Sequence, residues 1–81
     1  MKLNIISPEG VLYEGEVKSA TFPSIMGVFE VLPHHAPLIA AMKEGKILYE
    51  TDSESKEMEV QDGFVEVKDD VITVCIEQKK A

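Results

Sequence analysis

Two adjacent histidines, His34 and His35, carry the side chains of this sequence that are best suited to chemistry near neutral pH. In an extended segment neighbouring side chains point to opposite faces, so the two imidazoles are poorly placed to bind one metal ion. The His-x-His and helical His-x3-His spacings of common metal sites do not occur in the sequence. We expect a loop in which Pro33 and Pro37 fix the backbone, with one histidine making a structural hydrogen bond or facing a partner.

Cys75 and the serines are the remaining candidate nucleophiles. Cys75 lies in an alternating segment with no neighbouring cation or helix start to activate it, so we expect a buried structural thiol. The serines lack the context of a nucleophile elbow, and the glycines match neither a Walker loop nor a dinucleotide-binding fingerprint. We predict no catalytic residue, no metal site, no cofactor and no small-molecule ligand. An enzyme that combines His35 with a carboxylate elsewhere in the chain stays open as an alternative.

The charge balance excludes several kinds of partner. The chain has 8 Lys and no Arg against 15 Asp and Glu, which gives a net charge of −7. A nucleic-acid binder must neutralise phosphates, so we expect no nucleic acid partner. The acidic balance also opposes docking on anionic lipid. No apolar run approaches the ~20 residues of a spanning helix, and the N-terminal run is too short for a signal sequence, so we expect no direct membrane insertion.

The length allows one domain. A chain of 81 residues and 9.0 kDa is expected to form a single domain over residues 1–81. Its net stability is expected to be only about 3–5 kcal/mol, which a partner could increase. Nine Val and seven Ile outnumber five Leu and five Ala, and β-branched side chains fit a pleated surface better than a helix. Composition therefore predicts an all-β fold.

Turn-forming residues recur at short intervals, which is typical of a sandwich or barrel of short strands. Between the turns apolar and polar residues alternate, so that Val65 in one run and Ile72 in the next are expected to face a core. Asp69-Asp70 separates these two runs and predicts a two-residue hairpin turn. The predicted strands are residues 2–7, 12–22, 28–32, 46–51, 56–61, 64–68 and 71–77.

Three segments depart from simple alternation. Gly15, inside the predicted 12–22 strand, predicts a bulge or bend where that strand passes from one sheet to the other. Asp62-Gly63 is typical of a turn. The 36–43 segment is rich in alanine and could form two helical turns, although Pro37 leaves no room for a longer helix. Its secondary structure stays open.

The most unusual predicted surface is the turn-rich 23–37 stretch. It contains Ile25, Met26, Val28 and Phe29, which are large apolar residues in a segment expected to be exposed. Apolar residues in such a loop either fill the core or form a binding tip, and the sequence favours neither.

Six segments follow one another in a specific order and spacing. They are Ser-Pro-Glu-Gly at 7–10, Gly-Glu-Val at 15–17, Phe-Pro at 22–23, Gly-Val-Phe-Glu-Val-Leu-Pro-His-His-Ala-Pro-Leu at 27–38, Lys-Glu-Gly at 43–45 and Asp-Gly-Phe-Val-Glu-Val at 62–67. The most specific part is the Leu-Pro-x-His-Ala-Pro-Leu pattern at 32–38. In these segments the chain resembles the epsilon subunit of the F-type ATP synthase over nearly its whole length.

This resemblance implies a two-sheet β-sandwich of about ten short strands, similar to the N-terminal domain of that subunit. It also implies a non-catalytic central-stalk rotor subunit of a proton-translocating synthase. One side of the domain would bind the gamma subunit and its lower loops would rest on the c-ring, which couples rotation to ATP synthesis. The implied location is peripheral, on the cytoplasmic face of the cell membrane. A protein-interaction adaptor unrelated to the synthase is the alternative, and partner identity would separate the two.

Two groups of residues match functional positions of that family. The positions expected to face the c-ring are Ser24, Ile25, Met26, Gly27, Val28, Phe29 and His35, and those expected to face gamma are Ser7 and Ala40. The family commonly has an acidic residue where Val28 stands, which implies a more apolar contact with the ring. At Glu30 a side chain replaces the family's glycine, so either φ is negative there or local strain is tolerated.

Many bacterial members of the family continue into a C-terminal helical hairpin that can inhibit rotation or bind ATP, whereas this sequence stops at Ala81. If this is the natural length, we expect inhibition by a hairpin and nucleotide sensing to be missing. The 78–81 tail has no apolar face and is expected to fray.

Overall fold

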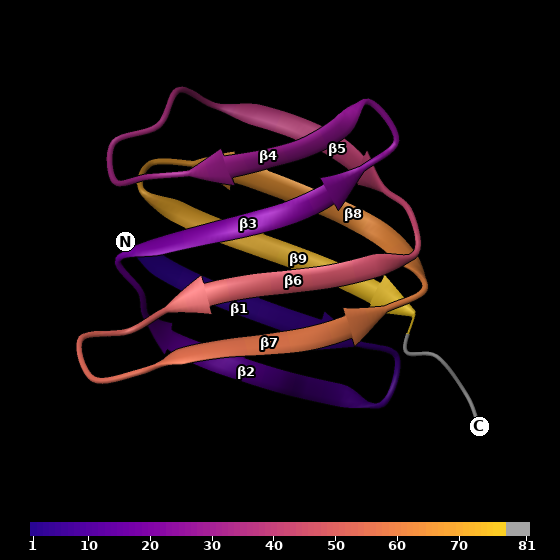
Figure 1. Ribbon diagram of the computed structural model, residues 1–81, viewed down its shortest axis with the longest axis horizontal. Helices are drawn as coiled ribbons and strands as arrows, with labels where there is room; N and C mark the ends of the chain where they lie inside the picture. The colour runs from indigo at the N-terminus through magenta and orange to yellow at the C-terminus, as the bar shows by residue number, and fades with distance from the viewer. Residues whose placement is uncertain (78–81) are drawn as a thin grey trace.

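The computed structural model describes residues 1–77, and the predicted fraying of residues 78–81 lies outside that range. Residues 1–77 contain nine strands and no helix. The strands form one continuous sheet that curls into two facing layers (Figure 1). The strands are β1 (Lys2–Ser7), β2 (Gly10–Glu16), β3 (Ser19–Ser24), β4 (Gly27–Val31), β5 (Leu38–Met42), β6 (Gly45–Glu50), β7 (Ser55–Val60), β8 (Asp62–Lys68) and β9 (Val71–Glu77). Residues 1–77 contain no helix long and apolar enough to cross a membrane.

The two layers are neighbouring parts of the same sheet. One layer has the order β2-β1-β9-β8-β5, and the other has the order β4-β3-β6-β7. Paired strands are antiparallel except β1 and β9, which run parallel. β5 and β3 meet at the pair of Met42 with Ser24, and the sheet folds over at this point. The predicted all-β, two-layered sandwich is confirmed, with nine described strands in place of about ten.

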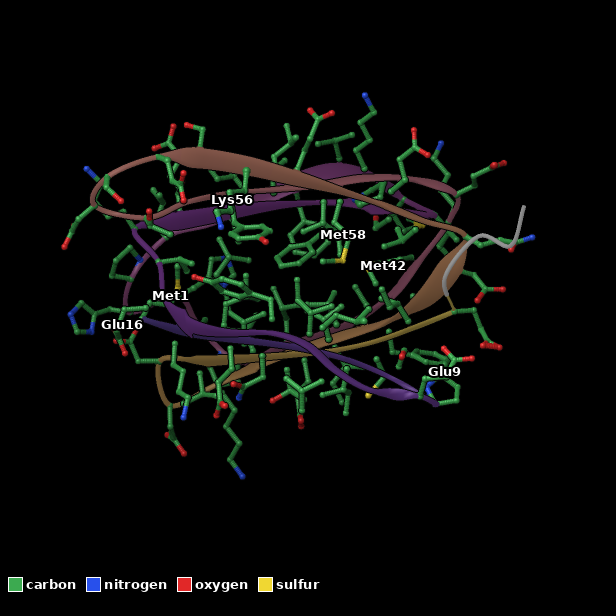
Figure 2. The ribbon with its side chains drawn as sticks, turned by 90° about the horizontal axis from the view of Figure 1, so that it is seen from below. Met1, Glu9, Glu16, Met42, Lys56 and Met58 are labelled. Atoms are coloured by element: carbon green, nitrogen blue, oxygen red, sulfur yellow. The ribbon has the colours of Figure 1, made fainter. Side chains whose placement is uncertain are left out.

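Apolar side chains from both layers meet in a core between them (Figure 2). Alternate residues along β8 and β9 are buried, which confirms the predicted inward positions of Val65 and Ile72. Phe22 of β3 is fully buried, and its ring centroid lies 5.6 Å from that of Phe29 on β4. Burial of one such side chain contributes about 1.5–3 kcal/mol. The buried apolar residues are Leu3, Ile5, Val17, Ala20, Phe22, Val31, Met42, Ile47, Tyr49, Val60, Val65, Val67, Ile72, Val74 and Ile76.

The predicted strand over residues 12–22 is in fact two strands. β2 ends and β3 begins on either side of Val17-Lys18, where the chain crosses from one layer to the other. Val17 is buried, and the Lys18 N–H donates to the Glu50 carbonyl oxygen at 2.7 Å. The crossing therefore has its own core residue and its own hydrogen bond, and it needs no glycine.

The bulge predicted at Gly15 is wrong. Gly15 pairs in register with its β1 partner, and the shift of register between β1 and β2 lies between Ile5 and Ile6. A Cβ at Gly15 would lie 2.8 Å from the Tyr13 hydroxyl oxygen, so the glycine makes room for the tyrosine ring. That ring packs on Tyr49 of the other layer, with 4.6 Å between the ring centroids.

The 36–43 segment, which the sequence left open, contains the strand β5 and forms no helical turn. Leu38, Ala40 and Met42 pack against the core. Ile39 lies between them and is 74% exposed, so the side chains follow the two-residue period of a strand. Every residue of β5 pairs with β8, and this ladder outweighs the helical preference of a short alanine-rich segment.

The turn predicted at Asp62-Gly63 is also wrong, because both residues lie inside β8. Gly63 pairs with β9 and has φ of 151. A Cβ there would collide with the Cys75 carbonyl oxygen, so glycine is what allows the two strands to approach so closely.

The predicted Asp69-Asp70 hairpin turn is confirmed. The two φ values are 54 and 64, which match a two-residue type I′ turn.

Candidate protein-interaction surface

The two histidines lie in the loop of residues 32–37, which joins β4 of one layer to β5 of the other. His34 is exposed and has φ of 66. His35 is half-buried, and its Nδ1 lies 2.7 Å from the Ala36 carbonyl oxygen. Because a carbonyl oxygen can only accept, Nδ1 carries the proton, and the predicted structural hydrogen bond is present. Residues 1–77 hold no cluster of three or more His, Cys, Asp or Glu placed to bind a metal ion.

Cys75 is exposed, so the predicted buried thiol is wrong. Its neighbours Val74 and Ile76 are both buried, which puts Cys75 on the outer face of β9. The alternation of the strand predicts this orientation by itself, whereas the expectation of burial rested on how often cysteines are buried in general.

The turn between β3 and β4 is built by Ser24. The side chain is buried, and its Oγ donates to the Gly27 carbonyl oxygen at 2.6 Å and accepts from the Met26 N–H at 3.0 Å. Gly27 has φ of 121, which residues with a Cβ rarely adopt. These interactions fix Ile25 and Met26 at the tip of the hairpin. Further along β4, Glu30 is not among the described residues with positive φ, so its side chain causes no strain.

The apolar residues of this turn divide between core and solvent. Phe29 is half-buried and packs on Phe22. Ile25, Met26 and Val28 are 65%, 92% and 72% exposed. The structure thus assigns Phe29 to the core and the other three side chains to an exposed tip, which we call the apolar turn. Large apolar side chains clustered in this way are typical of protein-interaction sites.

A row of apolar side chains crosses the outer face of the layer that contains β8. Its successive members are cross-strand neighbours: Ala41 with Phe64, Phe64 with Cys75, Cys75 with Ile6, and Ile6 with Val11. We call these residues the apolar band. Phe64 and Val11 are 62% and 65% exposed. An apolar row on a face that alternation usually leaves polar indicates a binding surface.

The apolar turn adjoins one end of this band. The Ile25 N–H donates to the Ala41 carbonyl oxygen at 3.1 Å, which brings the turn beside the β5 end of the band. Ile39, two residues before Ala41 and 74% exposed, adds to the apolar surface on β5. The Ile25 end of the apolar turn therefore lies beside the β5 end of the band.

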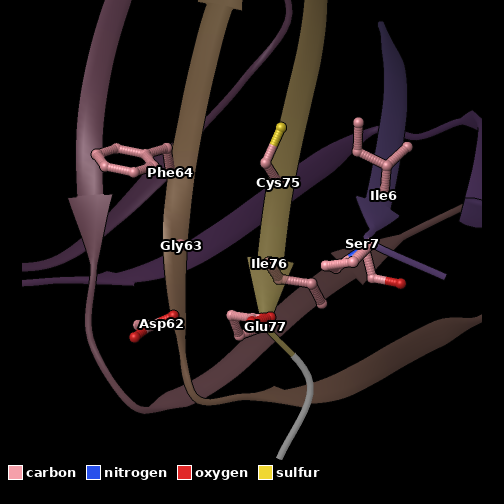
Figure 3. A pocket seen from close by; sticks show the side chains of 9 residues that line it. Ile6, Ser7, Asp62, Gly63, Phe64, Cys75, Ile76 and Glu77 are labelled. Carbon is pink, nitrogen blue, oxygen red and sulfur yellow. The ribbon is translucent and has the colours of Figure 1, made fainter. Parts of the chain in front are cut away.

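A groove of about 380 Å³ lies beside the band, where β1, β8 and β9 come together (Figure 3). Phe64 and Cys75 of the band line it. Ser7, predicted to face gamma, lines the same groove. The acidic residues Asp62 and Glu77 also line it.

Ala40, the other position predicted to face gamma, packs toward the core and pairs with Val65. Its neighbours Ile39 and Ala41 take the outward positions of β5. Sequence reasoning also missed Phe64. A signal for it was available, because an inward Val65 requires its neighbour Phe64 to face outward.

The positions predicted to face the c-ring do not all lie together. The apolar turn and the loop that carries His35 are at opposite ends of β4. Ser7 lies at the same end as the turn, since it lines the groove beside Gly63. Gly63 pairs with Met42, which in turn pairs with Ser24. Ser7 and the apolar turn therefore share one end of the domain.

Known proteins resemble this chain in sequence. A family model described as the beta-sandwich domain of the ATP synthase Delta/Epsilon chain matches residues 1–80. The ATP synthase epsilon chain of Leptospira interrogans serogroup Icterohaemorrhagiae serovar copenhageni is 42% identical over 74 residues, which are 91% of this chain and 58% of that protein. The ATP synthase epsilon chain of Chlorobium limicola is 39% identical over 67 residues, which are 82% of this chain and 76% of that protein.

A solved structure resembles it in fold. A chain in the cryo-EM structure of the central stalk and c-ring of the Tetrahymena thermophila mitochondrial ATP synthase superposes with a TM-score of 0.85. The superposition covers 96% of this chain and 63% of that one, at 13% sequence identity. At this low identity the likeness shows that the two chains share a fold.

Proposed function

Because this chain belongs to the family of the β-sandwich domain of ATP synthase delta and epsilon chains, we propose that it is a central-stalk rotor subunit of a proton-translocating F-type ATP synthase. In this role residues 1–81 form one domain that links the gamma subunit to the c-ring and transmits rotation for ATP synthesis. The domain is peripheral, at the cytoplasmic face of the cell membrane, and its protein partners hold it there. It supplies contacts and no catalytic residue of its own.

The observation that carries this proposal is the apolar band, with the exposed apolar turn beside its β5 end, on an otherwise acidic domain. Burial of apolar surface is what gives a lasting protein-protein contact its core, with polar groups at the rim. The chain has a net charge of −7, and Asp62 and Glu77 line the groove beside the band. This arrangement fits a partner face of apolar side chains flanked by lysine or arginine.

We assign the band and its groove to gamma. Ser7, a predicted gamma-facing position, lines the groove. Ala40, the other such position, lies between Ile39 and Ala41, and these neighbours would make the contact on the outer face. The assignment thus keeps β5 as part of the predicted gamma contact, but the side chains that touch gamma are those of Ile39 and Ala41 and not that of Ala40.

We assign the apolar turn to the c-ring. Ile25, Met26 and Val28 offer apolar surface there, so the contact would depend on burial and would respond little to salt. His35 lies at the other end of β4 and would reach the ring through a separate contact.

A charge placed in the band tests the assignment to gamma. Phe64 is 62% exposed, so Phe64→Asp should leave the fold intact while it puts a carboxylate into the apolar contact. We expect retention of the chain by the gamma-containing stalk to fall by about tenfold or more. Ser53→Asp is the matched control, because it adds the same charge at an exposed residue of the β6–β7 turn, in the other layer. If Phe64→Asp were retained as well as the parent chain, the band would not be the gamma contact.

A further inference from the structure

The 32–37 loop holds an uncommon backbone conformation. Pro33 and Pro37 restrict φ at two of its positions. Between them His34 has φ of 66, and positive φ is uncommon for a residue with a side chain, although histidine adopts it more often than most. A contact from another part of the chain would stabilise this conformation.

Asp70 supplies such a contact. Its Oδ1 accepts a hydrogen bond from the His34 N–H at 2.9 Å, across 36 residues of sequence. Asp70 lies in the β8–β9 turn, and its carbonyl oxygen accepts from the Lys2 N–H at 3.1 Å. Its Oδ2 lies 3.7 Å from the amino nitrogen of Met1. One residue thus touches the loop, the hairpin turn and the start of β1.

We propose that Asp70 is a positioning residue for the 32–37 loop. Its carboxylate holds the His34 N–H and so sets the path by which the chain leaves β4 and enters β5. A hydrogen bond to an ionised carboxylate is stronger than one between neutral groups, which suits a single bond that has to order a loop. The loop also carries His35, so Asp70 would help to place His35 for a contact with the c-ring. Only this last step rests on the proposed function.

The pKa of Asp70 agrees with this geometry. The His34 N–H stabilises the ionised carboxylate and lowers the pKa of Asp70 below its ordinary value. The Met1 amino group and the His34 side chain also face Asp70, and both lower its pKa, whereas desolvation raises it.

The test compares variants of the 81-residue chain by amide hydrogen exchange, measured for each residue by NMR. Asp70→Ala removes the acceptor, and we expect the His34 amide to exchange about tenfold faster or more. Asp69→Ala is the matched control, because Asp69 has φ of 54 in the same turn and makes no hydrogen bond to the loop among the described contacts. His34 exchange in the control should stay within about twofold of the parent chain.

Asp70→Asn gives a second readout, which does not depend on the alanine variant folding. Asparagine tolerates positive φ and keeps an acceptor oxygen, but it carries no titrating carboxylate. In the parent chain the chemical shift of the His34 amide should change as the pH falls through the pKa of Asp70. In Asp70→Asn this change should be absent, because amino groups and imidazoles are already protonated in that acidic range.

Three results would overturn the proposal. The His34 amide could exchange in Asp70→Ala as slowly as in the parent chain, it could exchange faster by the same factor in both alanine variants, or its chemical shift could change with pH in Asp70→Asn as it does in the parent.

Co-purification of the parent chain with ATP synthase subunits is a separate measurement. If the parent chain does not co-purify while His34 responds as expected, the proposed function fails and the role of Asp70 stands. If it co-purifies and His34 does not respond, the role of Asp70 alone fails.

Discussion

At single positions of this domain, backbone geometry decides which residue fits. Gly63 lies where a Cβ would meet the Cys75 carbonyl oxygen, and Gly27 closes the β3–β4 hairpin with φ of 121. Asp69 and Asp70 hold positive φ with side chains that are short and polar, a class that tolerates this conformation. Substitution at these positions would therefore disturb the geometry of the turns and the spacing of the strands directly, and the packing of the core only as a consequence.

Protonation of Asp70 should destabilise the fold at acid pH. The His34 N–H first, and then the positive charge of the Met1 amino group, lower the pKa of Asp70 from its ordinary 3.8, although desolvation opposes them. A carboxylate with a lower pKa in the folded state contributes stability above pH 3.8 and loses it as the pH falls through the folded-state value. We expect the difference in unfolding free energy between the parent and Asp70→Ala to shrink below pH 3.8. Denaturant titrations from about pH 2 to 7 measure this difference, and a constant value would contradict the account.

Ile72→Asp should unfold the domain. Ile72 is fully buried, and an unpaired charge there costs an amount comparable with the total stability, about 3–5 kcal/mol for a chain of this size. Val65→Asp should have the same effect for the same reason. Cys75→Asp in the same strand is the control, because Cys75 is exposed and its variant should stay folded. Circular dichroism and thermal melting measure the outcome, and a normally folded Ile72→Asp would show that our assignment of the inner face of β9 is wrong.

The inner and outer positions of β8 and β9 could be predicted from sequence because their alternation is unbroken. Cys75 was misplaced when a general preference for burial was given more weight than its place in that alternation. The roles of Gly15 and Gly63 could not be predicted. Each makes room for an atom that the fold brings close, the Tyr13 hydroxyl in one case and a carbonyl oxygen of β9 in the other.

At the scale of the element, strands were predictable where turn residues flank an alternating run. β1 and β9 have the predicted bounds, and β4, β6 and β7 are shifted by one residue. β5 could not be assigned, because its pairing with β8 and β3 is long-range and its local composition also suits a helix. The residues of the apolar turn could be predicted from sequence. The apolar band could not, because its members become neighbours only through the register in which their strands pair.

Charging the apolar turn should weaken attachment to the c-ring without unfolding the domain. Met26 and Val28 are 92% and 72% exposed, so Met26→Asp with Val28→Asp disturbs little of the core. Each side chain offers apolar surface whose full burial contributes about 1.5–3 kcal/mol, so we expect at least about a tenfold loss of affinity. The measurement is binding of the chain to detergent-solubilised c-ring.

A matched control for this double variant adds the same two charges elsewhere. Ser53→Asp with Ser55→Asp places them on two exposed residues, one in the β6–β7 turn and one at the start of β7, at the other end of the strands from the apolar turn. This control should bind like the parent chain. If the Met26 and Val28 double variant also bound like the parent, the assignment of the turn to the ring would be wrong.

Across the whole molecule, exposed apolar side chains gather in the band and the turn, and acidic residues such as Asp62 and Glu77 border them. The chain carries a net charge of −7, while the apolar band and the apolar turn adjoin each other on one face and at one end of the sheet. A domain of this size has little stability to spare, and a partner that binds only the folded state stabilises it by mass action. The arrangement suits a subunit that works in a permanent assembly.

The most direct test of the proposed function is the identity of the proteins that bind this chain in its own cell. The chain would be tagged, expressed in the native host and recovered from gently solubilised membranes. We predict that the gamma subunit, the c-ring and the catalytic head of an ATP synthase co-purify with it in fixed proportion. Recovery of the chain alone, or with unrelated proteins in fixed proportion, would contradict its role as a subunit of the rotor.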